Sequence, residues 1–207
     1  MKGRFITIEG PDGAGKTTAA GHVRDMLEAR GIPCLLTREP GGSGIAEQIR
    51  TILLDPGNTA MDPLTEAILY AAARRQHLME VVRPALEAGM TVICDRFVDS
   101  SLAYQGQARN LGFEAVWEIN HPAIQDMMPD ITVLVDIGEE EALKRIRSRG
   151  GCDRFDLEDS RFRQQVREGF LEAARRFPER IVIINGEQSE DQVARDIMQV
   201  LETRLGL

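Results

Sequence analysis

Residues 5–18 read FITIEGPDGAGKTT, and they join a short apolar run to a glycine-rich turn. The turn from Gly10 to Thr17 fits the pattern G-x-x-x-x-G-K-[ST] at every fixed position. Glycines at 10, 13 and 15 allow positive φ angles and a close approach of the backbone to a polyphosphate. Lys16 can then reach the β- and γ-phosphates, and Thr17 can offer its hydroxyl to Mg²⁺. The helix that starts here points its positive dipole end at the anion. The stretch therefore predicts a phosphate-binding loop for a nucleoside triphosphate, and an unliganded glycine-rich turn is the less favoured interpretation.

Composition restricts the classes of protein to consider. The chain has 207 residues, 43% of them hydrophobic and 28% charged, which suits one α/β domain of ordinary globular composition. A net charge of −8 argues against a non-specific nucleic-acid binder, which needs a basic surface. No apolar run is long enough to span a bilayer, and the first strand starts too early to follow a signal peptide, so we expect a cytoplasmic protein without a membrane partner.

Cysteine and histidine do not indicate a metal site. The three cysteines and three histidines are scattered and lack the spacing of a disulfide framework or a zinc site. We therefore expect a structural or surface role for each histidine, and neither a disulfide framework nor a zinc site for the cysteines.

Apolar runs alternate with amphipathic segments along the whole chain. This alternation predicts a parallel sheet with helices on both faces, in a single P-loop α/β domain over residues 1–207. The expected strands cover residues 5–8, 34–37, 90–94, 131–137 and 180–185. The expected helices cover residues 18–30, 43–54, 63–88, 113–120, 139–148, 159–177 and 189–205, with one more helix capped at its start by Asp99.

Charged residues follow two of the expected strands. Arg38 follows the second expected strand, just before a Pro-Gly-Gly turn, and Asp95-Arg96 follow the third. Ligands of open α/β sheets bind at these carboxyl ends, where P-loop enzymes also hold Mg²⁺ with an acidic residue. Asp95 is thus a candidate metal-binding residue and Arg96 a candidate phosphate-binding one. A solvated Arg–Glu pair in an ordinary turn is the alternative for Arg38.

Two helical segments carry side chains suited to a planar base. Tyr70 and Arg74 lie four residues apart on one helix, so a ring and a guanidinium project together. Ser101, Tyr104 and Gln105 share a face of the next helical segment, and Ser and Gln can bond a base edge. A solvated cation–π pair and a polar helix face are the alternatives, and the sequence alone leaves both open.

A glycine- and arginine-rich segment, RGGCDR at 149–154, separates two expected helices. It is typical of a mobile lid, here about residues 149–157, that closes over phosphates, excludes water and supplies positive charge. A surface loop with solvated arginines is the alternative.

Taken together, GPDGAGKTT, TREPGG (37–42), DRFVDSSLAYQG (95–106) and RGGCDR resemble the motifs of the thymidylate kinase family. The resemblance covers essentially the whole chain, and it is to the bacterial type, in which an arginine lies in the lid rather than in the phosphate loop. It implies a nucleoside monophosphate kinase-like P-loop fold. It also implies Mg²⁺-dependent phosphoryl transfer from ATP to dTMP in dTTP synthesis, and a homodimer.

The resemblance assigns roles residue by residue. ATP phosphates would contact the loop, Mg²⁺ would contact Thr17 and Asp95, and dTMP would be held by residues from five segments. The implied ATP-binding residues are Gly10, Pro11, Asp12, Gly13, Ala14, Gly15, Lys16, Thr17 and Thr18. The implied dTMP-binding residues are Asp12 at the 3′-hydroxyl, Arg38 and Arg96 at the phosphate, Tyr70, Arg74, Ser101 and Gln105 at the base, and Tyr104 beside the sugar. The implied catalytic residues are Lys16, Asp95, Arg96 and the lid arginines Arg149, the first choice, and Arg154, the second.

Two positions depart from the family pattern. Tyr70 stands where the family usually stacks a phenylalanine on thymine, and Gly150-Gly151-Cys152 make the lid looser than expected. Three other functions remain in view: a kinase of a different nucleoside monophosphate, a nucleotide-dependent switch, and a motor or nucleic-acid ATPase. The absence of an N-K-x-D motif weighs against the switch, and the acidic charge weighs against the last.

Overall fold

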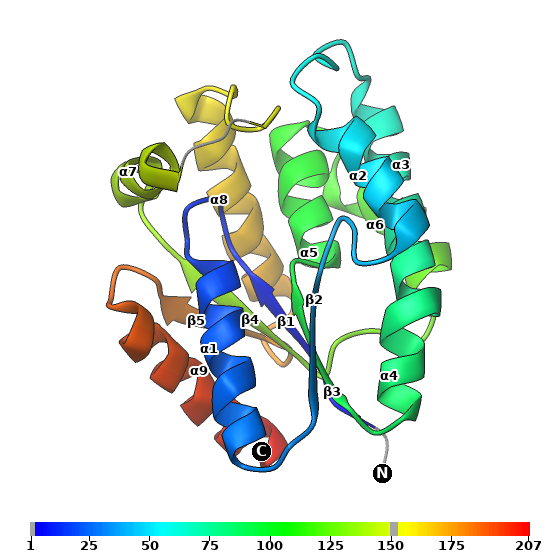
Figure 1. The fold of residues 1–207 in the computed structure, drawn as a ribbon. Helices are drawn as coiled ribbons and strands as arrows, with labels where there is room; N and C mark the ends of the chain where they lie inside the picture. Colours follow the sequence, from blue (N-terminus) through cyan, green and yellow to red (C-terminus); the bar gives the residue numbers. More distant parts are fainter. Residues whose placement is uncertain (1–2, 150–152) are drawn as a thin grey trace.

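Five parallel strands form the central sheet of this computed structural model, which describes residues 3–149 and 153–207 (Figure 1). Their order is β2-β3-β1-β4-β5, so β1 and its phosphate loop lie in the middle. The strands are β1 (Phe5–Glu9), β2 (Cys34–Arg38), β3 (Thr91–Asp95), β4 (Ile131–Asp136) and β5 (Ile181–Asn185). Every residue of β1 and β3 is buried, as expected of strands covered by helices on both faces.

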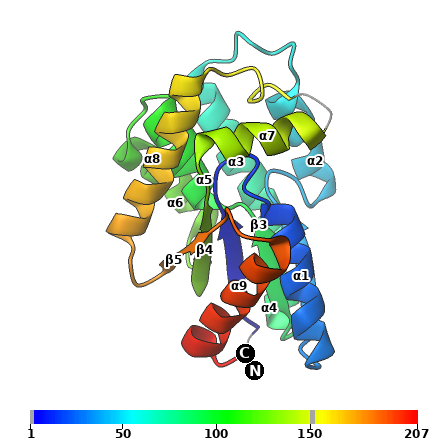
Figure 2. The same ribbon diagram turned by 90° about the vertical axis from the view of Figure 1, so that its left-hand side faces the viewer.

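Helices cover both faces of this sheet. On one face α1 (Lys16–Ala29) and α9 (Glu190–Leu205) pack on β1, β3 and β4 through side chains such as Val23, Leu27 and Ile197, all fully buried (Figure 2). The other face carries α4 (Arg83–Glu87), α5 (Val98–Ser101) and α8 (Ser160–Arg176). Outside these lie α2 (Gly44–Leu54), α3 (Pro63–His77) and α6 (Phe113–Ile124), and α7 (Glu139–Arg149) crosses near the loop. The expected five-stranded parallel sheet with helices on both faces is confirmed.

The expected helix over 63–88 is interrupted by a wider turn. A π-helical turn, η1 (Leu78–Val82), separates α3 from α4, and the Arg83 N–H donates to the Leu78 carbonyl five residues earlier. Pro84 has no N–H to give to the turn before it, so a regular α-helical ladder fails here. A second π-helical segment, η2 (Leu102–Ala108), continues α5.

The expectation that Asp99 caps a helix is wrong. Phe97 precedes the first helical residue, and Asp99 lies inside the helix with 1% exposure. Its carboxylate accepts two hydrogen bonds from Arg180, at 2.6 and 2.7 Å. The buried ion pair with Arg180, which is remote in sequence, thus takes the Asp99 carboxylate that would otherwise cap the helix. Ser189, by contrast, does cap α9, because its side chain accepts from the Gln192 N–H.

The remaining helix bounds differ from expectation by few residues. The helix expected at 113–120 extends four residues further, to Ile124, and Pro122 lies within its last turn. Among the described residues, no helix combines the length and apolar character that a membrane crossing requires.

Candidate active site

The phosphate loop joins β1 to α1 at the carboxyl edge of the sheet, in the crevice where open α/β sheets bind ligands (Figure 1). Gly10 and Gly13 are required by close packing within the protein as well as by the close approach of a phosphate. A Cβ on Gly10, at φ +146°, would lie 2.3 Å from the Val135 carbonyl oxygen, and one on Gly13, at φ +82°, would lie 2.5 Å from that of Ala142. Neighbouring backbone therefore leaves no room for a side chain at either position.

Lys16 lies in this loop with its side chain almost enclosed. Its Nζ donates to the Pro11 carbonyl at 2.8 Å. Burial, with a smaller contribution from the neighbouring Arg96, lowers the pKa of Lys16 from 10.5 to about 8, and Asp12 and Asp95 act in the opposite direction. The ammonium group therefore remains largely protonated at neutral pH, and an arriving phosphate would raise its pKa again.

Thr17, in the first turn of α1, meets Asp95, the last residue of β3, at the carboxyl edge of the sheet. Thr17 Oγ1 donates to Asp95 Oδ2 at 2.5 Å, across the boundary between α1 and β3. A hydroxyl beside a carboxylate is a donor set that Mg²⁺ accepts, since this ion commonly uses one or two protein oxygens together with substrate phosphates and water. Among the described residues there is no cluster of three or more His, Cys, Asp or Glu side chains that could hold a metal ion by itself. The pair thus fits a cation shared with a phosphate chain.

Arg96 follows Asp95 in an unusual backbone conformation. Its φ is +72°, in the left-handed region that non-glycine residues rarely adopt. Buried Glu9 supports this turn by accepting from the Phe97 and Ser100 N–H groups at 2.7 and 3.1 Å. Burial, with the nearby Asp99, raises the pKa of Glu9 to about 7. The turn aims the Arg96 guanidinium back across the loop.

The guanidinium of Arg96 ties the loop to η2. It donates to the Gly10 carbonyl at 3.1 Å and to Asp12 Oδ1 at 2.6 Å. Tyr104 Oη donates to the other oxygen of Asp12 at 2.7 Å, and the Tyr104 ring lies 5.2 Å from the guanidinium carbon. Asp12, Arg96 and Tyr104 thus form one connected group at the mouth of the loop.

Arg38 reaches the same cleft from the end of β2, where it pairs with Asp95 in the sheet register. Its guanidinium donates to Glu47 of α2 at 2.9 Å, and half of its side chain is exposed. The residue that follows it, Glu39, does not form a solvated pair with Arg38: it is buried and lies 2.8 Å from Arg74 Nε and 3.0 Å from His77 Nδ1.

The base-binding candidates lie on the opposite side. Tyr70, Ser101 and Gln105 line the cleft, whereas Arg74 lies behind its surface with 2% exposure. Arg74 donates to Glu39, Ser101 and Asn120 and to the Phe97 carbonyl, so four of its five N–H groups bind within the protein. It can therefore offer at most one N–H to a ligand.

One cleft of about 510 Å³ collects most of the candidates. Those in its lining are Asp12, Gly13, Gly15, Lys16, Thr17, Thr18, Arg38, Tyr70, Asp95, Arg96, Ser101, Tyr104 and Gln105. Arg154 is not among them: it is 5% exposed and forms an ion pair with Glu66 at 2.6 Å. The side chain of Arg149 and residues 150–152 lie outside the described part of the chain.

Sequence reasoning missed several polar and aromatic residues around the cleft. Arg50 lines it beside Arg38, and Phe155 packs against both Tyr104 and Tyr70, with ring centroids 5.4 and 6.5 Å apart. Buried Glu39 also lines it, and buried Glu66 supports it from behind. Phe155 could have been found as the aromatic neighbour of a lid arginine, but nothing local marks the two carboxylates.

Comparison with known proteins gives one consistent result. Residues 8–197 match the family model described as thymidylate kinase. The thymidylate kinases of Bacillus velezensis and Oceanobacillus iheyensis are 53% and 52% identical to the chain over 207 residues. In both cases 99% of this chain is covered, with 98% and 92% of the respective relative. A crystal structure of the thymidylate kinase from Ehrlichia chaffeensis superposes with a TM-score of 0.79 at 32% identity, and the match covers 98% of this chain and 99% of that one.

These matches extend over nearly the full length of the chain and of each relative, and the solved structure shares the fold described above. They agree with the resemblance carried by the four sequence motifs and do not favour a switch protein or a motor ATPase. The chain belongs to the thymidylate kinase family.

Proposed function

We propose that the cleft at the carboxyl edge of the sheet is where this thymidylate kinase transfers a phosphoryl group from ATP to dTMP. The enzyme converts dTMP to dTDP in dTTP synthesis, with ATP as the phosphate donor. The observation that carries the site assignment is convergence: the phosphate loop, Arg38, Asp95-Arg96 and Gln105 come from distant parts of the chain and line a single cleft.

The ATP phosphates lie along the loop from Gly10 to Thr18. Backbone N–H groups of the loop and the start of α1 supply the partial positive charge. Lys16, held by the Pro11 carbonyl, turns its ammonium to the transferred group. The low pKa of Lys16 supports this role, because an ammonium that is poorly solvated in the free protein gains most from an incoming anion.

Thr17 and Asp95 would hold Mg²⁺ in this proposal. The ion would neutralise charge on the phosphates and help to orient them for displacement. Asp95 also keeps Thr17 Oγ1 in place, through the contact described above.

The acceptor side uses the group around Asp12. Arg96 and Arg38 bind the dTMP phosphate, and Asp12 accepts from the 3′-hydroxyl of the deoxyribose. Tyr104 fills the space beside the sugar where a ribose would carry its 2′-hydroxyl, so the hydrogen bond from Tyr104 to Asp12 supports discrimination against ribonucleotides. At the base, Tyr70 stacks on thymine, and Gln105, Ser101 and the remaining Arg74 N–H bond its edge.

The transfer itself requires little covalent chemistry from the protein. The attacking phosphate oxygen is already ionised, so no general base is needed, and catalysis rests on alignment and on neutralising charge. Arg149 supplies the lid charge at the transferring group in this proposal. Arg154 is the weaker choice because Glu66 and the Leu53 carbonyl already hold its guanidinium.

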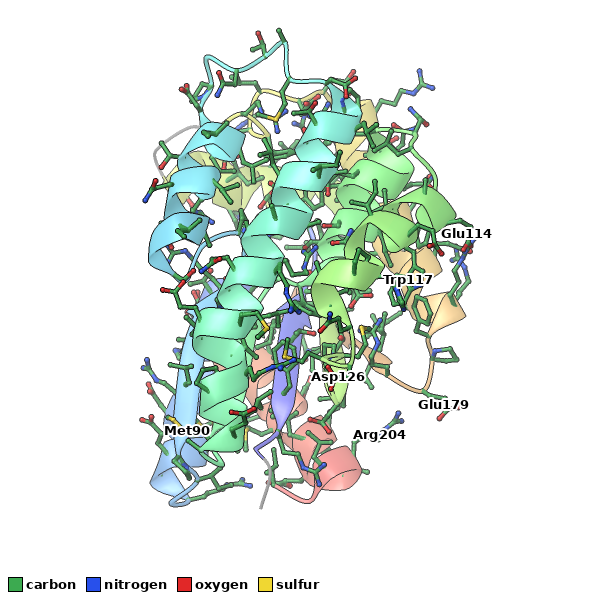
Figure 3. The ribbon with its side chains drawn as sticks, turned by 90° about the vertical axis from the view of Figure 1, so that its right-hand side faces the viewer. Met90, Glu114, Trp117, Asp126, Glu179 and Arg204 are labelled. Atoms are coloured by element: carbon green, nitrogen blue, oxygen red, sulfur yellow. The ribbon has the colours of Figure 1, made fainter. Side chains whose placement is uncertain are left out.

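We assign the whole chain to one domain and to a homodimer. Ile45 and Ile52 of α2 and Leu64 and Ile68 of α3 are each about half exposed. These helices pack against each other and, with α6 and its Trp117, form the side shown in Figure 3. Exposed apolar side chains on adjacent helices favour burial against a second copy. Sedimentation equilibrium tests this assignment, and a monomer at micromolar concentration would contradict it.

The acceptor specificity is tested with a panel of nucleotides. ADP release is measured with ATP and Mg²⁺ in the presence of dTMP, dUMP, ribose-TMP, dCMP, dGMP, AMP or no acceptor. The highest kcat/KM should belong to dTMP, with ribose-TMP far behind because of Tyr104. Equal turnover of ribose-TMP would refute the sugar assignment, and a preference for another base would refute the assignment of the base-binding residues.

A further inference from the structure

Glu66 has no part in the chemistry above, yet its carboxylate is fully buried beside the base side of the cleft. It lies in the first turn of α3 and contacts three other side chains. Its Oε1 accepts from Gln105 Nε2 at 2.7 Å. Its Oε2 forms an ion pair with Arg154 at 2.6 Å and another with Arg109 at 3.4 Å. Neither contact has the geometry of a hydrogen bond.

The contact with Glu66 fixes which end of the Gln105 amide faces the ligand. A carboxylate paired with two guanidinium groups has no proton to donate, so the atom that approaches it at 2.7 Å must be the amide nitrogen. The amide carbonyl then points the other way. Gln105 lines the cleft, and no side chain or backbone group among the described residues donates to its Oε1. Glu66 therefore leaves an acceptor, and not a donor, for the base.

This acceptor distinguishes pyrimidines by the hydrogen at N3. Thymine and uracil carry an N3–H that can donate to it, with O4 beside it as an acceptor. Cytosine presents the reverse pattern, an unprotonated N3 beside the N4 amino group. The single uncommitted Arg74 N–H suits O4 for the same reason. A base with the wrong pattern would leave buried polar groups unpaired, and such mismatches give the largest discrimination that binding sites achieve.

We propose that Glu66 is a specificity-determining residue: by holding the Gln105 amide in one orientation, it selects acceptors that donate at N3 and rejects those that accept there. The proposal rests on the proposed function, because it takes Gln105 to face the base of the acceptor nucleotide. Glu66 acts through Gln105 and is a positioning residue.

The test compares three acceptors that share the deoxyribose phosphate: dTMP, dUMP and dCMP. Glu66→Gln is nearly isosteric, but its amide can donate or accept, so Gln105 is free to turn its NH₂ to the base. The ratio of kcat/KM for dTMP over dCMP should fall at least tenfold, mainly through KM. The ratio of dTMP over dUMP should stay within twofold, because both bases donate at N3. A general loss of structure would not separate these two ratios.

A double-mutant cycle with Gln105→Leu shows whether the effect passes through Gln105. In the Gln105→Leu background, Glu66→Gln should change the dTMP over dCMP ratio by less than twofold. An equal effect in both backgrounds, or an unchanged ratio in Glu66→Gln alone, overturns the inference and leaves the proposed function standing. A wild-type enzyme without dTMP turnover overturns both.

A second pair of variants covers the case that Glu66→Gln does not fold, since it leaves two arginines without their carboxylate. Arg154→Met is compared with Glu66→Met/Arg154→Met, which removes both members of the closer ion pair. The dTMP over dCMP ratio of the double variant should be at least tenfold below that of Arg154→Met. Equal ratios in this pair overturn the inference.

Discussion

The two walls of the cleft are built in different ways. The phosphate wall, which comprises the loop 10–18, Arg38, Asp95 and Arg96, uses short segments that follow strand ends, and the Arg38 side chain is half exposed. The base wall, which comprises Tyr70, Arg74, Ser101 and Gln105, lies on helical segments, and two buried carboxylates hold Arg74 and Gln105. The Arg38 guanidinium in the first wall is half exposed and accessible to a ligand, whereas the Arg74 guanidinium in the second donates almost entirely to groups within the protein. The first should therefore control the rate and the second specificity and stability.

The largest effect is expected at the centre of the phosphate wall. Lys16→Met should lower kcat by about 10³-fold, with KM for dTMP changed little, because the lost charge acts mainly on the transferring group. Steady-state kinetics with ATP and dTMP measures both parameters. Arg24→Met is the matched control, since Arg24 lies on the same helix and forms an ion pair with its exposed neighbour Asp25. A comparable loss in the control would point to damage to α1.

The two lid arginines should behave differently from each other. Arg149→Ala should lower kcat by on the order of a hundredfold while the Kd of dTMP stays nearly constant. Arg154→Ala should act mainly on thermal stability, because Arg154 is buried against Glu66. Single-turnover rates and melting curves on both variants distinguish the two roles. Unaltered turnover in Arg149→Ala would remove that residue from the mechanism.

An arginine-to-lysine substitution in each wall compares how much the two walls contribute to the free energy of unfolding. Arg74→Lys should lower the free energy of unfolding by about 2–3 kcal/mol, because lysine cannot reproduce four hydrogen bonds in a fixed fork inside the protein. Arg38→Lys should stay within about 0.5 kcal/mol, since the side chains of Arg38 and its partner Glu47 are 51% and 41% exposed. Urea unfolding followed by circular dichroism measures both values. Equal losses would contradict the contrast between the walls.

A smaller effect should follow from pH at the phosphate wall. The Lys16 pKa of about 8 lies below its ordinary 10.5, and the protonated form binds phosphate, so ATP affinity should be constant below pH 8. Above pH 8 affinity should fall by up to tenfold per pH unit. Calorimetric titration between pH 6.5 and 9.5 measures this. In Lys16→Arg, which keeps its charge throughout, the decline should disappear.

The smallest effect is expected from Tyr70→Phe in the base wall. Stacking uses the ring, so kcat/KM for dTMP should stay within about twofold of the wild-type value. Burial raises the pKa of Tyr70 well above 10, so its hydroxyl stays neutral and carries no charge that the substitution would remove. A loss beyond tenfold in the same kinetic assay would assign the hydroxyl a direct bond to the substrate.

The sequence predicts the phosphate wall better than the base wall, for a physical reason. In the phosphate wall the required atoms are backbone groups and side chains within a few residues of a strand end, so a local pattern is enough. The partners of the base wall are remote in sequence, with Glu66 lying 39 positions from Gln105 and Glu39 lying 35 from Arg74. Those contacts depend on how α3 packs, which no local pattern encodes. The same limit explains Asp99, whose capping signal is real but weaker than its ion pair with Arg180.

The backbone of Arg96 has a consequence for how the sequence can change. At φ +72° a glycine would relieve the strain, yet only an arginine supplies the guanidinium that joins Gly10, Asp12 and Tyr104. Substitutions that suit the backbone there remove the charge, and those that keep the charge keep the strain. Substitutions selected for heat resistance should therefore occur at other positions of the chain. In a mutant library screened for growth, position 96 should be among those that tolerate the fewest substitutions.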